Sequence, residues 1–148
     1  MNPKVVFYDV SPEAWDEEIF KLAAAAWSRG QARLLIVVDG PKRAEDLDAF
    51  LWTHREEVFL PHEIAADTGD LMDPSARVLI SSSHGHRHGA TLLLADRPVP
   101  LDFAADFEVV MDVVDHRSDE ALEASRARFK AWRQRGVQPE HRRAKPSS

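Results

Sequence analysis

The chain has 148 residues, of which 44% are hydrophobic and 30% are charged, and its formal net charge at neutral pH is −6. These values are typical of a single soluble globular domain that is long enough to bury a hydrophobic core. The absence of cysteine excludes a disulfide framework, a thiolate metal site and a thiol nucleophile.

No stretch of the sequence resembles a membrane-spanning segment or a signal peptide. The longest apolar runs are far shorter than the roughly 20 residues that a membrane-spanning helix requires. The N-terminus enters directly into the apolar run at residues 5–8, without a basic segment and a long apolar stretch before it. We therefore expect a cytoplasmic protein that does not bind a membrane.

The first third of the chain alternates predicted strands and helices. Residues 4–10 are β-branched and aromatic, which predicts a buried strand, and Ser11 and Pro12 then begin a helix that ends near Gly30. Residues 33–38 form a continuous apolar run, typical of a strand that is covered on both faces. Pro41 begins a second helix that continues to about residue 52. This order predicts a parallel α/β sheet with right-handed crossovers.

The loops that follow these two strands lack the features of a nucleotide-binding fold. Residues 9–12 contain no glycine, and Gly40 is followed by Pro41, which has no N–H to donate to a phosphate. Neither G-x-G-x-x-G nor G-x-x-x-x-G-K-[ST] occurs in the chain. We therefore predict a Rossmann-like fold without a dinucleotide-binding fingerprint, and we expect no cofactor.

The remaining segments complete a single predicted domain. Residues 77–81, 91–95 and 107–114 are predicted strands, whereas residues 65–75 and 98–102 are predicted loops. We expect one α/β domain over residues 1–137, with a mostly parallel central sheet and helices on both faces. Residues 138–148 are polar and show no apolar pattern, so we expect a mobile C-terminal tail.

Residues 118–136 predict one amphipathic helix. Ser118 is a favoured N-cap residue, acidic residues occupy the first turn, basic residues occupy the last turn, and Gly136 follows. At about 100° per residue, one stripe is expected to be buried. It contains Leu122, Ser125, Phe129 and Trp132. Basic side chains border this stripe on both sides, Arg126, Lys130 and Arg133 on one and Arg128 and Arg135 on the other.

The charge of the chain changes sign near this helix. Residues 126–148 hold 8 of the 19 Lys and Arg side chains but only one of the 25 Asp and Glu side chains, Glu140. A cationic end on an acidic body indicates that an anionic partner binds at one place, rather than nucleic acid over the whole surface. A solvated helix face followed by a basic tail explains the same residues equally well.

Histidines suggest an alternative function, a metal-dependent enzyme of Rossmann-like fold. His84, His86 and His88 lie within five residues of one another, but the neighbouring glycines argue against a regular strand that would point them the same way. No Asp, Glu or Cys within the loop completes a ligand set, so we favour a flexible loop and predict no metal site. His62, after Pro61, has no motif-spaced partner, and we expect it to be structural.

Four stretches together resemble a known family, the chi subunit of bacterial DNA polymerase III holoenzyme. They are Phe7-Tyr8, residues 47–52 (LDAFLW), residues 59–62 (FLPH) and the Arg/Lys-rich helix over residues 126–136. They occur in the order and with spacings similar to those of the family. The resemblance implies a non-catalytic accessory subunit of the clamp-loader complex in the replisome.

The resemblance also implies a partner, the acidic C-terminal tail of single-stranded-DNA-binding protein (SSB), which ends in an aromatic residue and a free carboxylate. Through it the chain would contact DNA only indirectly. The family's arginine and lysine fall on Arg126 and Lys130, with Phe129 in place of the usual tyrosine. We add the neighbouring side chains to the predicted tail-binding site, since an apolar pocket edged by cations suits such a tail: these are Arg128, Trp132 and Arg133.

A second partner, the psi subunit, is implied where the organism has one. The resemblance puts its interface at Trp52 and Phe59. From the residues alone, core packing is the favoured interpretation of both aromatic side chains.

Overall fold

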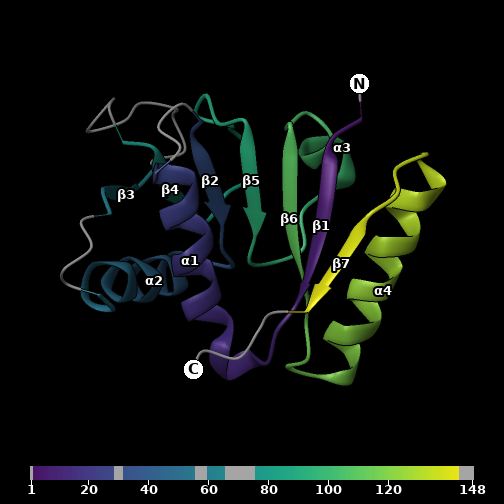
Figure 1. Cartoon of the computed structure of the whole chain (residues 1–148), viewed down its shortest axis with the longest axis horizontal. Coiled ribbons are helices and arrows are strands. Elements are labelled where there is room, and N and C mark those ends of the chain that lie inside the picture. The colour runs from purple at the N-terminus through teal and green to yellow at the C-terminus, as the bar shows by residue number, and fades with distance from the viewer. Residues whose placement is uncertain (1, 29–31, 56–59, 66–75, 144–148) are drawn as a thin grey trace.

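The computed structural model describes residues 2–28, 32–55, 60–65 and 76–143, which form one sheet flanked by helices (Figure 1). The strands are β1 (Lys4–Asp9), β2 (Leu34–Val37), β3 (His62–Ile64), β4 (Val78–Ser81), β5 (Leu92–Ala95), β6 (Val109–Val114) and β7 (Glu140–Arg143). The helices are α1 (Trp15–Ser28), α2 (Pro41–Thr53), α3 (Leu101–Ala104) and α4 (Asp119–Gln134), and a 3-10 turn at Pro12–Ala14 precedes α1. No helix in these ranges is long and apolar enough to cross a membrane.

The sheet is parallel throughout. Its strand order is β3-β4-β2-β5-β6-β1-β7, and every neighbouring pair is parallel. The predicted Rossmann-like α/β fold is confirmed, although the sheet is fully rather than mostly parallel. Because parallel neighbours are joined by long crossovers, the connecting helices cover the sheet on both faces.

Alternating residues of the central strands build two separate cores. Val6 and Tyr8 of β1 pack in the core formed with α1 and α2, whereas Val5 and Phe7 pack in the core formed with α3 and α4. The same alternation holds along β2, in which every residue is buried. This is why these strands are apolar at successive positions rather than at alternate ones.

Strand β7 differs from the prediction. Residues 140–143 were expected in a mobile tail, but they pair in parallel with β1 and form one edge of the sheet. All four side chains are exposed, so no apolar pattern marks the strand in the sequence. The ladder with β1 and ion pairs such as Lys4–Glu140, at 3.8 Å, hold it instead. The domain therefore extends beyond residue 137, and residues 144–148 lie outside the described range.

Two further short elements were not predicted. Strand β3 has only three residues and pairs with β4 at the opposite edge of the sheet from β7. Helix α3 has four residues and lies where two prolines predicted a loop, because Pro100 in extended conformation serves as its N-cap residue. Both elements are too short to show a periodic hydrophobic pattern in the sequence.

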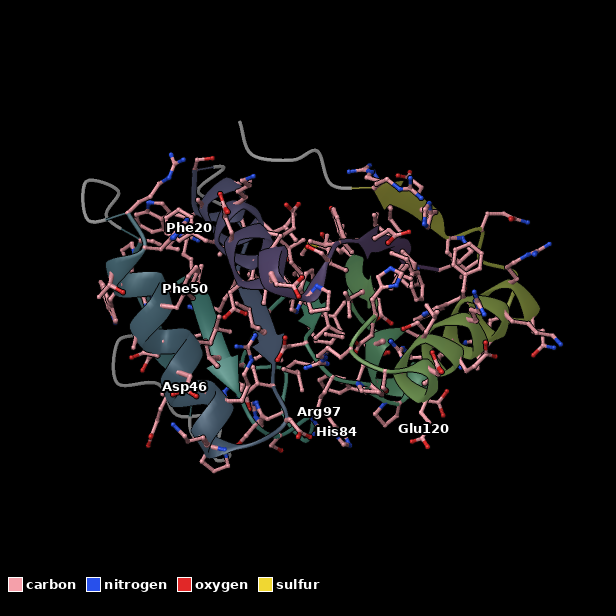
Figure 2. The ribbon with its side chains drawn as sticks, turned by 90° about the horizontal axis from the view of Figure 1, so that it is seen from below. Phe20, Asp46, Phe50, His84, Arg97 and Glu120 are labelled. Atoms are coloured by element: carbon pink, nitrogen blue, oxygen red, sulfur yellow. The ribbon has the colours of Figure 1, made fainter. Side chains whose placement is uncertain are left out.

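Helices α1 and α2 contact each other through aromatic rings. The His54 ring stacks on Phe50 of α2, with ring centroids 4.7 Å apart, and meets Phe20 of α1 edge to face at 5.1 Å. Phe20 and Phe50 lie on facing sides of the two helices in Figure 2. Both helices are thereby fixed on one face of the sheet.

A buried charge network joins α1, α2 and the end of β5. Asp96 is 2% exposed and accepts hydrogen bonds from Nε1 of Trp15 at 2.7 Å and from Nε of Arg43 at 2.8 Å. The Arg43 guanidinium also donates to both carboxylate oxygens of Asp16. Burial opposes the positive charge of Arg43, but the two carboxylates outweigh it and raise the pKa of the guanidinium.

Arg43→Ala should destabilise the fold by about 3–5 kcal/mol, because it leaves Asp96 buried and without its cation. Lys42→Ala is the matched control: Lys42 pairs with Asp46 at 3.1 Å in an exposed position, so its loss should cost less than about 1 kcal/mol. Urea unfolding at neutral pH measures both. Equal effects of the two substitutions would contradict a structural role for Arg43.

Candidate functional site

Helix α4 begins and ends at the predicted residues. The hydroxyl of Ser118 accepts a hydrogen bond from the N–H of Ala121 at 3.0 Å, which makes Ser118 the N-cap. Gly136 has a φ of +88°, a left-handed conformation that favours glycine, and its N–H donates to the carbonyl of Arg133. These two ends determine which side chains of α4 share a face.

The apolar stripe of α4 is divided between the core and the surface. Trp132 is 2% exposed and packs in the core with residues of β1 and β6. Leu122 and Phe129 are half-buried and line a surface pocket. We therefore correct the predicted tail-binding site: Trp132 is enclosed by the core and does not line the pocket.

The pocket lies between α4 and the β1–β7 edge of the sheet and has a volume of about 370 Å³. We call it the α4 pocket. Much of its wall is apolar, and the rings of Phe7 and Phe129 meet edge to face there with centroids 5.2 Å apart. The other lining residues are Asp9, Val114, His116, Leu122, Ser125, Arg126 and His141. A concave, largely apolar site with a few polar groups at its rim is the usual form of a ligand pocket.

The cations beside the α4 pocket are available at the surface. Arg126 lines the pocket and pairs with Glu123, at 2.6 Å, in a position where both side chains are more than half exposed. Such exposed ion pairs contribute little to stability, so an anionic ligand can replace Glu123 as the partner of Arg126 with little loss of free energy. Lys130 and Arg133 make no ion pair with any residue that the structure describes.

Arg128 lies on a different side of α4 from Arg126. Its guanidinium bonds both oxygens of Asp112 on β6, at 2.9 and 3.0 Å, and its side chain is 12% exposed. Burial raises the pKa of Asp112, while Arg128 and the N–H of Val113 oppose that rise. Arg128 is therefore committed to an internal ion pair, which corrects its predicted place among the tail-binding cations.

One cluster at the pocket has no counterpart in the sequence-based prediction. The carboxylate of Asp9 on β1 accepts hydrogen bonds from Nε2 of His116, at 2.6 Å, and from Nε2 of His141 on β7, at 3.0 Å. Burial alone would raise the pKa of Asp9, but the two histidine hydrogen bonds outweigh it and lower that pKa. The three residues are far apart in the sequence, so only the pairing of β7 with β1 reveals them.

Of the two residues predicted for the psi interface, the structure describes Trp52. Trp52, at the end of α2, is 43% exposed, and its ring lies on His62 of β3 with centroids 4.1 Å apart. Ile64, two residues further along β3, is 41% exposed. An exposed position differs from the core packing that the residues alone favoured for Trp52. Phe59 lies outside the described residues.

The four histidines singled out from the sequence do not form one cluster in the structure. His62 is buried, with its ring nitrogens facing the carbonyls of Leu60 and Asp48. In the loop before β5, His84 contacts Arg97 (Figure 2), Nδ1 of His86 accepts from the N–H of His88, and His88 is 4% exposed. Within the described ranges, no group of three or more His, Cys, Asp or Glu residues is arranged to hold a metal ion.

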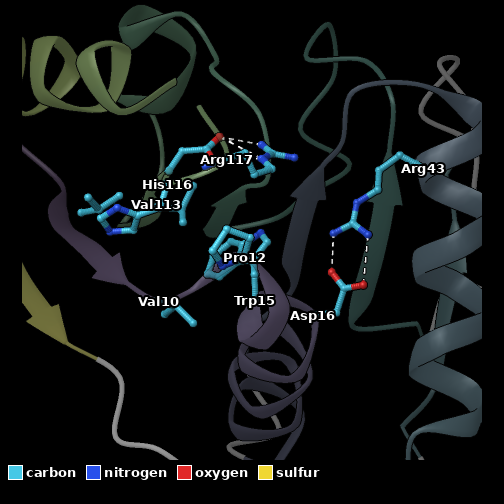
Figure 3. Close-up of a pocket in the computed structure, with 10 residues that line it drawn as sticks. Val10, Pro12, Trp15, Asp16, Arg43, Val113, His116 and Arg117 are labelled. Atoms are coloured by element: carbon cyan, nitrogen blue, oxygen red, sulfur yellow. Dashed lines mark hydrogen bonds and ion pairs between the residues drawn. The ribbon is translucent and has the colours of Figure 1, made fainter. Parts of the chain in front are cut away.

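A further pocket of about 250 Å³ lies at the carboxyl ends of β1 and β6 (Figure 3). The chain leaves these two strands toward opposite faces, which is where open α/β sheets often bind ligands. Arg43 is paired with Asp16 in this pocket, and Arg117 with Asp115, both at distances of 2.7 Å or less. Because each guanidinium already has a carboxylate, we assign this pocket no anion-binding role.

Arg128→Met should destabilise the fold by about 3–5 kcal/mol at neutral pH, because Asp112 then stays buried without a cation. The loss should shrink as the pH is lowered. Without Arg128, the folded state favours the neutral form of Asp112, so the pKa of Asp112 is higher in the folded variant than in the unfolded chain. The variant therefore loses stability as the pH rises through the folded-state pKa of Asp112. Urea unfolding of wild type and variant between pH 4 and 8 measures the difference. A loss that stays constant over this range would contradict the buried-charge explanation.

Comparison with known proteins identifies the family. The model of the family described as DNA polymerase III chi subunit, HolC, matches residues 2–140. The DNA polymerase III subunit chi of Escherichia coli is 29% identical over 126 residues, covering 83% of this chain and 81% of that protein. The subunit chi of Pseudomonas aeruginosa is 30% identical over 136 residues, covering 90% and 91%. The chain therefore belongs to the DNA polymerase III chi subunit family, with the accessory role in DNA replication that this membership implies.

Proposed function

We propose that the chain is a non-catalytic accessory subunit of the cytoplasmic clamp-loader complex, and that it binds the acidic C-terminal tail of SSB in the α4 pocket. The observation that carries this proposal is the α4 pocket itself, an apolar cavity walled by Phe7 and Phe129 with Arg126 at its rim. A terminal aromatic ring fits the apolar wall, and its carboxylate fits the arginine. Lys130 and Arg133 supply further positive charge on the same helix. This charge suits the acidic residues of the SSB tail that precede its terminal aromatic residue.

The strength of this contact can be estimated from its parts. Burying one aromatic side chain contributes roughly 1.5–3 kcal/mol. A charge-assisted hydrogen bond from Arg126 to the terminal carboxylate contributes about 1.5–3 kcal/mol more. Contacts to the remaining acidic residues add to this sum, and the ordering of a flexible tail reduces it. We expect an affinity of about micromolar, weakened by salt because the charges are exposed.

Arg126→Ala should weaken binding of a fluorescent acidic peptide ending in Pro-Phe-carboxylate by about tenfold or more, because it removes the charged contact to the carboxylate. Arg135→Ala is the matched control: Arg135 also lies at the surface after α4, but it pairs with Asp102 at 2.8 Å and does not line the pocket. Its loss should leave the affinity nearly unchanged.

The same titration tests which groups of the peptide the pocket recognises. Removing the terminal Phe, or amidating its carboxylate, should abolish or greatly weaken binding to the wild-type chain. An affinity that is unchanged by both peptide modifications would exclude the α4 pocket as the site of a terminal aromatic residue. Equal binding by folded Arg126→Ala and wild type would exclude Arg126.

We further propose that Trp52, with Ile64 beside it on β3, contributes to a surface for the psi subunit. Exposed large hydrophobic side chains such as these are favoured as anchors in protein interfaces. Both emerge at the β3 edge of the sheet, because Trp52 packs on His62 and residues 62 and 64 share a face of that strand. Phe59 belongs to the same proposal through the family resemblance.

Trp52→Ala should weaken the association with the psi subunit of the same organism by about 2 kcal/mol or more, measured by isothermal titration calorimetry. Glu45→Ala provides the control, since Glu45 is an exposed residue of the same helix. Binding of the SSB-tail peptide should be unchanged in both variants. Unaltered psi binding by folded Trp52→Ala would remove Trp52 from this interface.

A further inference from the structure

The Asp9–His116–His141 cluster connects three separate parts of the chain at the wall of the α4 pocket. Asp9 ends β1, His116 lies between β6 and α4, and His141 belongs to the edge strand β7. All three residues line the pocket. The cluster therefore places two imidazole rings in the wall of the cavity that Arg126 also lines.

We propose that His116 and His141, positioned by Asp9, form a second anion contact of the α4 pocket and bind the carboxylates of its ligand as imidazolium groups. This inference rests on the function proposed above. It adds two binding residues to the pocket, His116 from the β6–α4 connection and His141 from β7, and it predicts a dependence on pH that an arginine alone would not produce.

The hydrogen bonds to Asp9 determine which nitrogen remains available. Each ring directs Nε2 at a carboxylate oxygen, so Nε2 carries a hydrogen in both histidines. In the neutral form, Nδ1 is then an acceptor and repels a carboxylate. Protonation converts Nδ1 into a donor, while the Nε2 hydrogen bond to Asp9 is kept. The rings are thus held in place in both states, and only their action on an anion changes.

The charge of the cluster reverses with this protonation. Asp9 with two neutral rings has a charge of −1, and with two imidazolium rings it has a charge of +1. The side chains of His116 and His141 are 38% and 49% exposed, so both rings are within reach of a ligand. Charge-assisted hydrogen bonds to a carboxylate are among the stronger polar contacts in proteins.

Other charged groups lie on the elements around the cluster, and Asp, Glu and Arg side chains ordinarily change charge far from neutral pH. The β6–α4 connection contributes Asp115 and Arg117, which pair with each other, and α4 contributes Arg126 with Glu123. Strand β7 contributes Glu140, Arg142 and Arg143, of which the first two are paired. Histidine is the side chain that ordinarily changes charge between about pH 5 and 8. A change in ligand affinity within that interval therefore reports on the two imidazoles.

The experiment is a titration of the SSB-tail peptide between pH 5.5 and 8.5 at constant ionic strength. Peptide carboxylates stay ionised in this range, because they ordinarily titrate near pH 4. Wild type should bind about tenfold more tightly at the acidic end, since protonated imidazole rings can donate to the ligand carboxylates there. The double variant His116→Asn/His141→Asn should vary less than about twofold, because asparagine can donate to Asp9 but cannot become charged.

The His84→Asn variant is the control for histidines elsewhere, since His84 contacts Arg97 and neither residue lines the pocket. It should keep the wild-type dependence on pH. A measurement on wild type alone needs no variant to fold: proton uptake on binding at pH 6.5 should make the calorimetric enthalpy differ between phosphate and Tris buffers.

The outcomes separate this inference from the proposed function. Binding that is tight at every pH, without proton uptake, would overturn the histidine contact and leave the SSB-tail function intact. A pH dependence retained in the folded double variant would likewise overturn it. Absence of peptide binding at every pH would overturn the proposed function and the histidine contact together.

Discussion

The ion pair between Asp112 and Arg128 determines how α4 lies on the sheet. Asp112 is buried on β6, and the guanidinium reaches it with two hydrogen bonds, supported by the hydroxyl of Ser125 one turn earlier on α4. Because Trp132 follows Arg128 by four residues, the same rotation of the helix turns Trp132 into the core. Phe129, the residue after Arg128, is about 100° further around the helix, and its half-buried ring meets the buried ring of Phe7 in the wall of the pocket. The position of the α4 pocket therefore depends on an interaction that does not line it.

Much of this arrangement could be predicted from the sequence because it rests on local or periodic signals. The five strands between the two edge strands are largely apolar at successive positions since both faces are covered, and α4 has an N-cap serine and a terminal glycine. Strand β7 could not be predicted in this way, because its four side chains are exposed and its partner β1 lies more than 130 residues earlier in the chain. The Asp9–His116–His141 cluster depends on that pairing and was missed with it.

The sequence also failed to distinguish the two arginines that border the stripe. Helical periodicity places Arg126 and Arg128 on opposite flanks, but it does not reveal which flank faces a carboxylate on the sheet. A signal was nevertheless present: Asp112 occurs in the apolar strand VVMDVV, where an unpaired carboxylate would be costly. A cation on the helix that immediately follows is the natural partner for it. Trp132 was assigned to the pocket for a related reason, since one apolar stripe can serve a core at one end and a cavity at the other.

The two proposed partner surfaces lie at opposite edges of the sheet, and this separation has a consequence for function. Trp52 packs on β3 and Ile64 belongs to that strand, whereas the α4 pocket adjoins β7, with five strands between the two edges. At roughly 4.8 Å per strand spacing, the edge strands are about 29 Å apart. A short peptide in the pocket would therefore not touch a subunit docked on the β3 edge, and neither partner would need to leave before the other bound. Two sites on one rigid sheet suit a subunit that links two assemblies, because each contact can be weak and exchangeable while both together hold the complex.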